Sequence, residues 1–430
     1  MKKLLALILT LALTFTMCVM FTACGNTGDN GSDGNTGDIL GMSDSPLAEK
    51  TLTVDYEVAD DFKIGFICLH DEKSTYDKNF IDAALKAQEA IGLTNEQVII
   101  KTNIPEGDEC YVAAKDLVDQ GCKIVFANSF GHEDFMIKAA KEFPEVQFCH
   151  ATGTKAHTEG LKNYHNAFAS IYQGRYLAGV AAGMKLNEMI EAGKITADKA
   201  KMGYVGAYTY AEVISGYTSF YLGAKSVCPT VTMDVQFTGS WYDATEEKNA
   251  AEALISAGAV LVSQHADSMG APSACESAGV PNVSYNGSTY DSCPETFIVS
   301  SRIDWAPYYN YIVRCVTKGE EIAADWCGGI AEGSVVLTGV NQDVAAEGTV
   351  DAIKNIVAKF EADEVKVFDT ANFTVGEKAL ETYTADVDTD AAFTPDTEAI
   401  ADGAFEESAK RSAPYFDVRI DGITLLNEKF

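Results

Sequence analysis

From Lys63 to about Thr317, short apolar runs alternate with longer amphipathic stretches, and no other feature of the sequence constrains the fold as strongly. The first run, Lys63–Leu69, is almost continuously apolar, which is typical of a strand buried on both faces of a parallel sheet. The stretch Asp77–Ile91 then places small apolar residues at helical spacing, and Gly92 follows as a helix stop. Repetition of this order predicts parallel sheets covered by helices on both faces.

The strand–helix order runs through two blocks of similar size, so we expect an α/β fold of two lobes joined by several chain crossings. Lobe 1 is expected to take residues 51–165 and about 288–325, and lobe 2 residues 166–287 and about 326–365. Residues 366–430 remain as a C-terminal extension. The predicted strands are 63–69, 97–101, 123–127, 147–149, 201–205, 232–237, 260–263, 282–285 and 296–301. The predicted helices are 77–91, 108–120, 133–143, 171–186, 211–227, 243–257, 271–278 and 305–317.

The N-terminus predicts export. Two lysines precede an apolar run over residues 4–20 that only threonines interrupt, which is the layout of a secretory signal peptide. The run ends at Phe21–Gly25, where Cys24 follows a small residue and resembles the lipobox of bacterial lipoproteins. This resemblance implies that residues 1–23 are removed and that Cys24 is lipidated. An uncleaved anchor is the alternative, although the run is short for a membrane span.

Residues 25–45 consist almost wholly of Gly, Asn, Asp, Ser and Thr. Such a segment buries too little apolar surface to fold, so we expect a flexible tether over residues 24–50. The chain would then contact the membrane through its lipid anchor only.

Charge and cysteine usage exclude several kinds of partner and site. The net charge of −31 disfavours nucleic acid and anionic lipid surfaces as partners. Of the eleven cysteines, Cys18 and Cys24 belong to the signal region, and the remaining nine are scattered through apolar runs, as buried small hydrophobic residues are. The six histidines show no metal-ligand spacing. We therefore expect a monomer with no metal, cofactor or disulfide framework.

Seven short motifs occur along the two blocks: VFANSFG at 125–131, HATG at 150–153, QGRYLAG at 173–179, GYVG at 203–206, SWYD at 240–243, QHADS at 264–268 and WAPYY at 305–309. Their order and spacing, from about Lys63 to Ala358, resemble those of the basic membrane protein (BMP) family, whose best-known members are similar to purine nucleoside receptors. The resemblance is greatest to a branch associated with adenine or related purine bases.

The resemblance to the BMP family implies a type I periplasmic-binding-protein fold and a solute-binding lipoprotein on the outer face of the cytoplasmic membrane. It implies that a purine base or nucleoside binds in a cleft between the lobes and passes to the permease and ATPase of an ABC importer. No catalysis is implied.

The loop after the first strand carries the first candidate ligand residues, because ligands of such lobes bind at the carboxyl ends of strands. In the family an aromatic residue of this loop stacks on the base, and the next residue hydrogen-bonds to it. Counting back from Gly92 places Tyr76 and Asp77 at these positions. Another alignment matches residues 77–80 to the family's Asp-Lys-Ser-Phe and makes Phe80 the stacking residue; we favour Tyr76. A purely structural interpretation makes Asp77 a helix N-cap.

Later strand ends carry further candidates. Trp241 follows strand 232–237, where the family has its second stacking aromatic residue, whereas Asp243 is better explained as a helix cap. Asn128 and Phe130 end the third strand and offer an amide and an apolar wall. Asp267 follows strand 260–263 as a possible hydrogen-bond partner.

The region that follows departs from the nucleoside receptors. Trp305 opens a helix and either lines the cleft or packs between the lobes. The family's sugar-binding Lys and Asp are replaced here by Ile303 and Asn286, although Arg302 offers a cation one residue away. These replacements favour a free base over a nucleoside, and Asn286 stays a candidate ligand residue.

Two other functions remain open. An enzyme such as a nucleosidase or esterase would use Glu72, Asp77 or Asp267 as acid and base, but the chain has no GxSxG or HExxH motif. A ligand sensor for a surface signalling partner would share the same fold and pocket.

Overall fold

The computed structural model of the chain describes residues 41–387 and 396–429. The expected signal peptide, the lipidation site Cys24 and the larger part of the expected tether lie outside the described residues. Within these described ranges, no helix has both the length and the apolar character needed to cross a bilayer.

The first sheet is parallel throughout and has the order β11-β5-β4-β3-β1-β2. Its strands are β1 (Ile64–Ile67), β2 (Val98–Lys101), β3 (Ile124–Ala127), β4 (Gln147–Ala151), β5 (Tyr164–Ala169) and β11 (Asp325–Gly328). The helices around it are α1 (Thr75–Ile91), α2 (Asp108–Asp119), α3 (Glu133–Glu142), α4 (Ala156–Glu159) and α9 (Ala306–Lys318). One face packs against α2 and α3 and the other against α1 and α9. We call this sheet with its helices the first lobe.

The second sheet has the order β12-β10-β9-β8-β6-β7-β17, in which only β12 is antiparallel to its neighbour. Its strands are β6 (Lys201–Gly206), β7 (Thr232–Phe237), β8 (Leu261–His265), β9 (Asn282–Tyr285), β10 (Phe297–Ile303), β12 (Val335–Leu337) and β17 (Ile423–Leu425). The helices around it are α5 (Ile171–Glu191), α6 (Ala211–Val227), α7 (Ala244–Ser256), α8 (Gly270–Ala278) and α10 (Thr349–Glu361).

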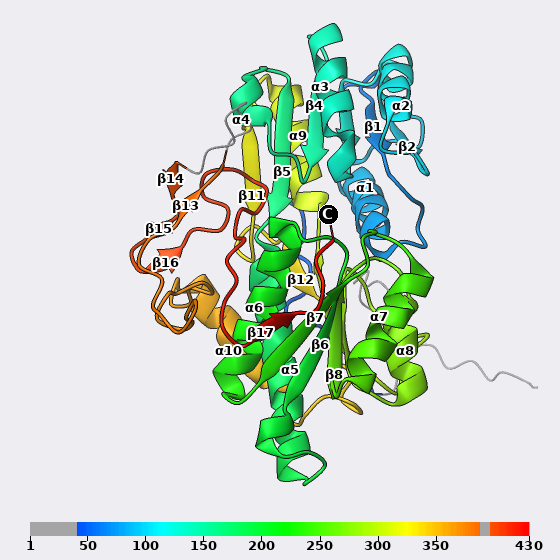
Figure 1. Ribbon diagram of the computed structural model, residues 1–430. Coiled ribbons are helices and arrows are strands. Elements are labelled where there is room, and N and C mark those ends of the chain that lie inside the picture. Colours follow the sequence, from blue (N-terminus) through cyan, green and yellow to red (C-terminus); the bar gives the residue numbers. More distant parts are fainter. Residues whose placement is uncertain (1–40, 388–395, 430) are drawn as a thin grey trace, which may run out of the picture. The chain divides into compact units, whose positions relative to one another are not determined.

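Figure 1 shows α7 and α8 together on one face of this second sheet, while α5 and α6 pack on the other. We call this sheet with its helices the second lobe. Parallel sheets covered by helices on both faces confirm the α/β class expected from the alternation of apolar and amphipathic segments.

The pattern of apolar runs missed β5 because its sequence includes two polar residues. His165 and Asn166 interrupt the apolar run, yet both are buried. The Asn166 side chain accepts a hydrogen bond from the Ala156 amide at 2.7 Å, and His165 Nε2 lies 2.8 Å from the side-chain oxygen of Gln147. These partners satisfy polar groups that otherwise make burial unfavourable.

The chain crosses between the sheets at points that differ from the expected boundaries. The strand expected at 296–301 was assigned to the first lobe, but β10 pairs with β9 and β12 in the second sheet. The chain returns to the first lobe only with α9, which packs beside α1. We therefore propose the two-lobe division with crossings after Ala169, Ile303 and Gly328.

The C-terminal extension ends in the second lobe. A strand is expected from the sequence at 416–420, but the structure places β17 at Ile423–Leu425, beside β7 at the sheet edge (Figure 1). Phe416 anchors the preceding segment, with ring centroids 4.3 Å from Phe368 and 4.8 Å from Phe405. The extension also contains the short strands β13 (Thr384–Ala385), β14 (Thr397–Glu398), β15 (Ile400–Ala401) and β16 (Ala404–Phe405).

Because Glu407 of the extension is buried, we expect the stability of the folded protein to depend on pH. Its side chain is buried and accepts a hydrogen bond from Ser215 Oγ at 2.5 Å. Burial raises its pKa from 4.5 to about 7. The folded chain thus holds a proton that the unfolded chain releases above pH 4.5, so stability is lost as the pH rises from there through about 7.

We expect Glu407→Gln to raise the unfolding free energy at about pH 8 by on the order of 2 kcal/mol, with much less change at about pH 5. Glutamine keeps the acceptor for Ser215 and does not ionise. Urea unfolding at both pH values measures the difference, and Glu406→Gln is the matched control because that neighbour is only half-buried. An equal change in unfolding free energy at both pH values would contradict the raised pKa of Glu407.

Candidate functional site

A small pocket lies where the strand ends of the two sheets face each other. From the first lobe it is lined by Leu69, His70, Tyr76, Asp77, Ser129, Phe130 and Thr152. From the second lobe it is lined by Glu212, Trp241, His265, Asp267 and Tyr285. Carboxyl ends of parallel strands are the usual ligand sites of such sheets, so this pocket is the candidate site.

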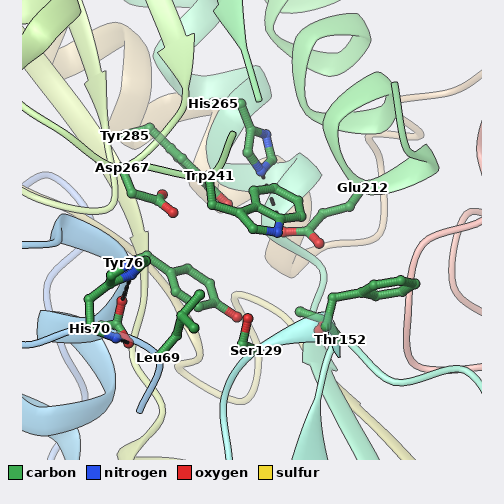
Figure 2. Close-up of a pocket in the computed structure, with 12 residues that line it drawn as sticks. Leu69, His70, Tyr76, Ser129, Thr152, Glu212, Trp241, His265, Asp267 and Tyr285 are labelled. Carbon is green, nitrogen blue, oxygen red and sulfur yellow. Dashed lines mark hydrogen bonds and ion pairs between the residues drawn. The ribbon is translucent and has the colours of Figure 1, made fainter. Parts of the chain in front are cut away.

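Two aromatic side chains face the pocket from opposite lobes. Figure 2 shows the ring of Tyr76 on one side and the indole of Trp241 on the other. The Tyr76 hydroxyl donates a hydrogen bond to the backbone oxygen of Asn128 at 2.6 Å, which fixes the ring. Trp241 packs edge-on against Tyr208, with ring centroids 5.1 Å apart. Both rings are therefore held in place by their own lobes.

Asp77 supports this wall of the pocket from behind. It is not the helix N-cap, because Ser74 has that role and accepts a hydrogen bond from the Asp77 amide. Its carboxylate accepts from the His70 amide at 3.0 Å and from the Asn128 side-chain amide at 2.7 Å. Burial acts to raise the pKa of Asp77, but the contact with the His70 imidazole at 3.3 Å, together with these hydrogen bonds, outweighs burial and the pKa is lowered. The ionised carboxylate thus holds the loops that carry the pocket residues.

Asp267 lines the second-lobe side of the pocket and is 5% exposed. Burial first, and then the negative charges of Glu247 and Asp77, raise its pKa well above 3.8. The protonated form that this favours offers one donor and one acceptor to a ligand. Its backbone oxygen accepts a hydrogen bond from the Thr75 amide at 3.1 Å, which joins the two lobes beside the pocket.

A buried histidine and a glutamate form the other side of the second-lobe wall. His265 Nε2 lies 3.4 Å from Glu212 Oε1, and the imidazole centroid lies 4.4 Å from the ring of Tyr285. Burial lowers the pKa of His265 in spite of the nearby Glu212 carboxylate. The neutral imidazole therefore contributes a polar surface without a positive charge.

The pocket includes five of the nine expected ligand residues: Tyr76, Asp77, Phe130, Trp241 and Asp267. Phe80 and Trp305 instead stack on each other in the core at 4.6 Å, each about 1% exposed. Asn128 lies behind Tyr76, with its side-chain oxygen accepting from the Leu69 amide. Asn286 accepts from the Asn79 side chain at 3.2 Å and so bridges the lobes.

Seven lining residues were not expected from the sequence: Leu69, His70, Ser129, Thr152, Glu212, His265 and Tyr285. Three of them belong to quoted motifs, Ser129 to VFANSFG, Thr152 to HATG and His265 to QHADS, and Tyr285 ends the predicted strand 282–285. Glu212 lies in the first turn of α6, where the sequence shows only a helix start. Its position in the pocket depends on how the two lobes face each other.

Comparisons with known proteins match the chain to a family model and to curated relatives. The family model Bmp, described as ABC transporter substrate-binding protein PnrA-like, matches residues 64–370. A purine-binding protein of Brucella abortus is 32% identical over 301 residues, covering 68% of this chain and 81% of the relative. A putative ABC transporter glucose-binding protein of Haloferax volcanii is 31% identical over 224 residues, covering 52% of this chain and 54% of the relative.

Solved structures show the same fold. An ABC transporter solute-binding protein from Conexibacter woesei superposes with a TM-score of 0.57 at 18% identity, covering 71% of this chain and 98% of that one. At this identity the match shows a shared fold, the two-lobe fold of periplasmic solute-binding proteins.

Proposed function

Because the chain belongs to the Bmp family of PnrA-like ABC transporter substrate-binding proteins, we propose that it captures a purine base, or a purine nucleoside, and delivers it to an ABC importer. Proteins of this family bind solutes for a transporter and are not catalytic. The protein's partners would be a small-molecule ligand and the permease and ATPase of the importer. Capture takes place outside the cytoplasmic membrane, and we propose that a lipid on Cys24 tethers the protein there.

The observation that carries the purine proposal is the pair of rings, Tyr76 and Trp241, which face one pocket from opposite lobes. Stacking of a base on one aromatic face contributes roughly 1–3 kcal/mol. A flat ligand between two such faces binds best when the lobes are closed, which couples binding to hinge closure. The similarity to a purine-binding protein supports the same class of ligand.

The residues around the pocket favour a free base over a nucleoside. Asn286, at the position of the family's sugar-binding Asp, is 2% exposed and already bonded to Asn79. Ile303, at the position of the sugar-binding Lys, is also 2% exposed. Arg302 forms an ion pair with Glu49 and does not line the pocket. The two side chains that hold the sugar in the family's nucleoside receptors therefore have no free counterpart here.

Calorimetric titration of the purified protein with adenine, guanine, hypoxanthine, adenosine and glucose tests the proposal. We expect one molecule of a purine base to bind per chain, more tightly than its nucleoside, with no heat from glucose. Binding of glucose without any purine would instead assign the protein a sugar, as named for the Haloferax volcanii relative. If none of the purines gives a heat of binding, the proposal is wrong.

A further inference from the structure

The segment from Phe405 to Asp417 of the C-terminal extension contacts both lobes, and we call it the bridging segment. The family model ends at residue 370, so this segment lies outside the part of the chain that the family model matches. On the second-lobe side, Glu407 accepts from Ser215 of α6 at 2.5 Å. Beyond the bridging segment, Lys429 exchanges hydrogen bonds with Thr209 at 2.6 and 2.8 Å, which attach the end of the chain to the second lobe.

On the first-lobe side the bridging segment is attached to the edge strand β11. The Cys327 thiol donates to Ser408 Oγ at 3.6 Å. The Ser412 amide and hydroxyl both donate to Asp325 Oδ1, at 2.9 and 2.8 Å. The other carboxylate oxygen of Asp325 lies 3.0 Å from His157 Nδ1. Glu407 and Ser408 are neighbours in sequence, so the attachment passes directly from one lobe to the other.

The bridging segment also lies beside the ligand pocket. Arg411, Ala413, Pro414 and Asp417 wall a second cavity. This cavity shares Phe130, Thr152 and Glu212 with the ligand pocket. The attachment therefore lies on the side of the molecule where the pocket meets its neighbouring cavity.

We infer that the bridging segment is a strap that joins the two lobes beside the pocket and slows ligand release. Solute-binding proteins of two lobes release their ligand by hinge opening, and product or ligand release is often limited by such a motion. Separation of α6 from β11 must break the contacts of Glu407, Ser408 or Ser412. The free energy needed to break these contacts therefore adds to the free energy of opening.

Ser408→Cys tests the strap by locking it, because the new thiol would face Cys327 of β11. After oxidation to a disulfide we expect release of adenine, or of whichever solute the titration identifies, to be at least about fivefold slower. Reduction of the same variant restores the original rate. The matched control is the double variant Cys327→Ser, Ser408→Cys, which has no partner thiol at this position and should show no redox effect.

Asp325→Ala tests the strap by releasing it. Loss of both Ser412 hydrogen bonds predicts release about 5–30-fold faster. Asp116→Ala is the control, because it removes a first-lobe ion pair with Lys101 of β2, at the edge of the sheet opposite to β11. Stopped-flow displacement measures the rates in all variants. Equal rates of ligand release in oxidised Ser408→Cys, reduced Ser408→Cys and Asp325→Ala would overturn the inference.

A second readout needs no ligand and separates the strap from the proposed function. The Thr75 amide donates across the lobes to Asp267, so its hydrogen exchange reports opening of the empty protein. We expect faster exchange of this amide in Asp325→Ala and slower exchange in oxidised Ser408→Cys. Unchanged exchange in both variants would overturn the strap even if purine binding is established.

Discussion

Replacement of Trp241 with alanine is expected to weaken purine binding roughly tenfold to a hundredfold, because one stacking face is lost. Trp241 is only half-buried and packs on the edge of Tyr208, so the variant should fold. Trp241→Phe keeps an aromatic face and should recover most of the affinity. Calorimetric titration with adenine measures all three proteins.

The neighbouring Tyr242 provides a matched control for the stacking prediction. Its ring is 37% exposed, lies 5.4 Å from His70 and does not line the pocket. Tyr242→Ala removes this contact with His70 of the other lobe but no stacking face of the pocket, so it should lower adenine affinity much less than Trp241→Ala. Wild-type affinity in Trp241→Ala would contradict the stacking model.

Replacement of Asp267 with alanine is expected to lower adenine affinity by a similar factor, roughly tenfold to a hundredfold, because a buried hydrogen-bonding partner of the base edge is lost. Asp267→Asn should lose much less, since the amide offers a donor and an acceptor in the place of the protonated carboxyl. Titration calorimetry on both variants tests which form of the side chain the ligand contacts.

The same side chain predicts how affinity depends on pH. Burial raises the pKa of Asp267 well above 3.8, so the neutral form persists at pH values where an exposed carboxyl is ionised. Affinity should fall as the pH rises through this pKa, since ionisation removes the donor. The fall should be absent in Asp267→Asn. An equal fall in wild type and Asp267→Asn would assign the pH dependence to another group.

The sequence predicted most of the strands that burial on both faces makes continuously apolar, although the short strand β12 was missed. Strands such as β1 and helices such as α6 were expected within a few residues of their bounds. β5 was missed because His165 and Asn166 are polar, and their burial depends on partners in neighbouring elements that the local pattern does not show. β17 and the strap depend on long-range pairing that the local pattern of residues does not contain.

The candidate site was predicted in part, for a related reason. Loops after strands can be recognised locally, which identified Asp267, and the resemblance to the family added Tyr76 and Trp241. Whether an aromatic side chain at such a position faces the pocket or the core depends on packing, and Phe80 and Trp305 stack on each other in the core. Glu212 lies in the first turn of α6. It lines the site only because the two lobes face each other.

The most direct test is a crystal structure of the protein with adenine bound. The account predicts the base between Tyr76 and Trp241, in van der Waals contact at about 3.5–4.0 Å with both rings, and Asp267 bonded to its edge. Adenine bound elsewhere, or an indole of Trp241 turned away from the ligand, would contradict it.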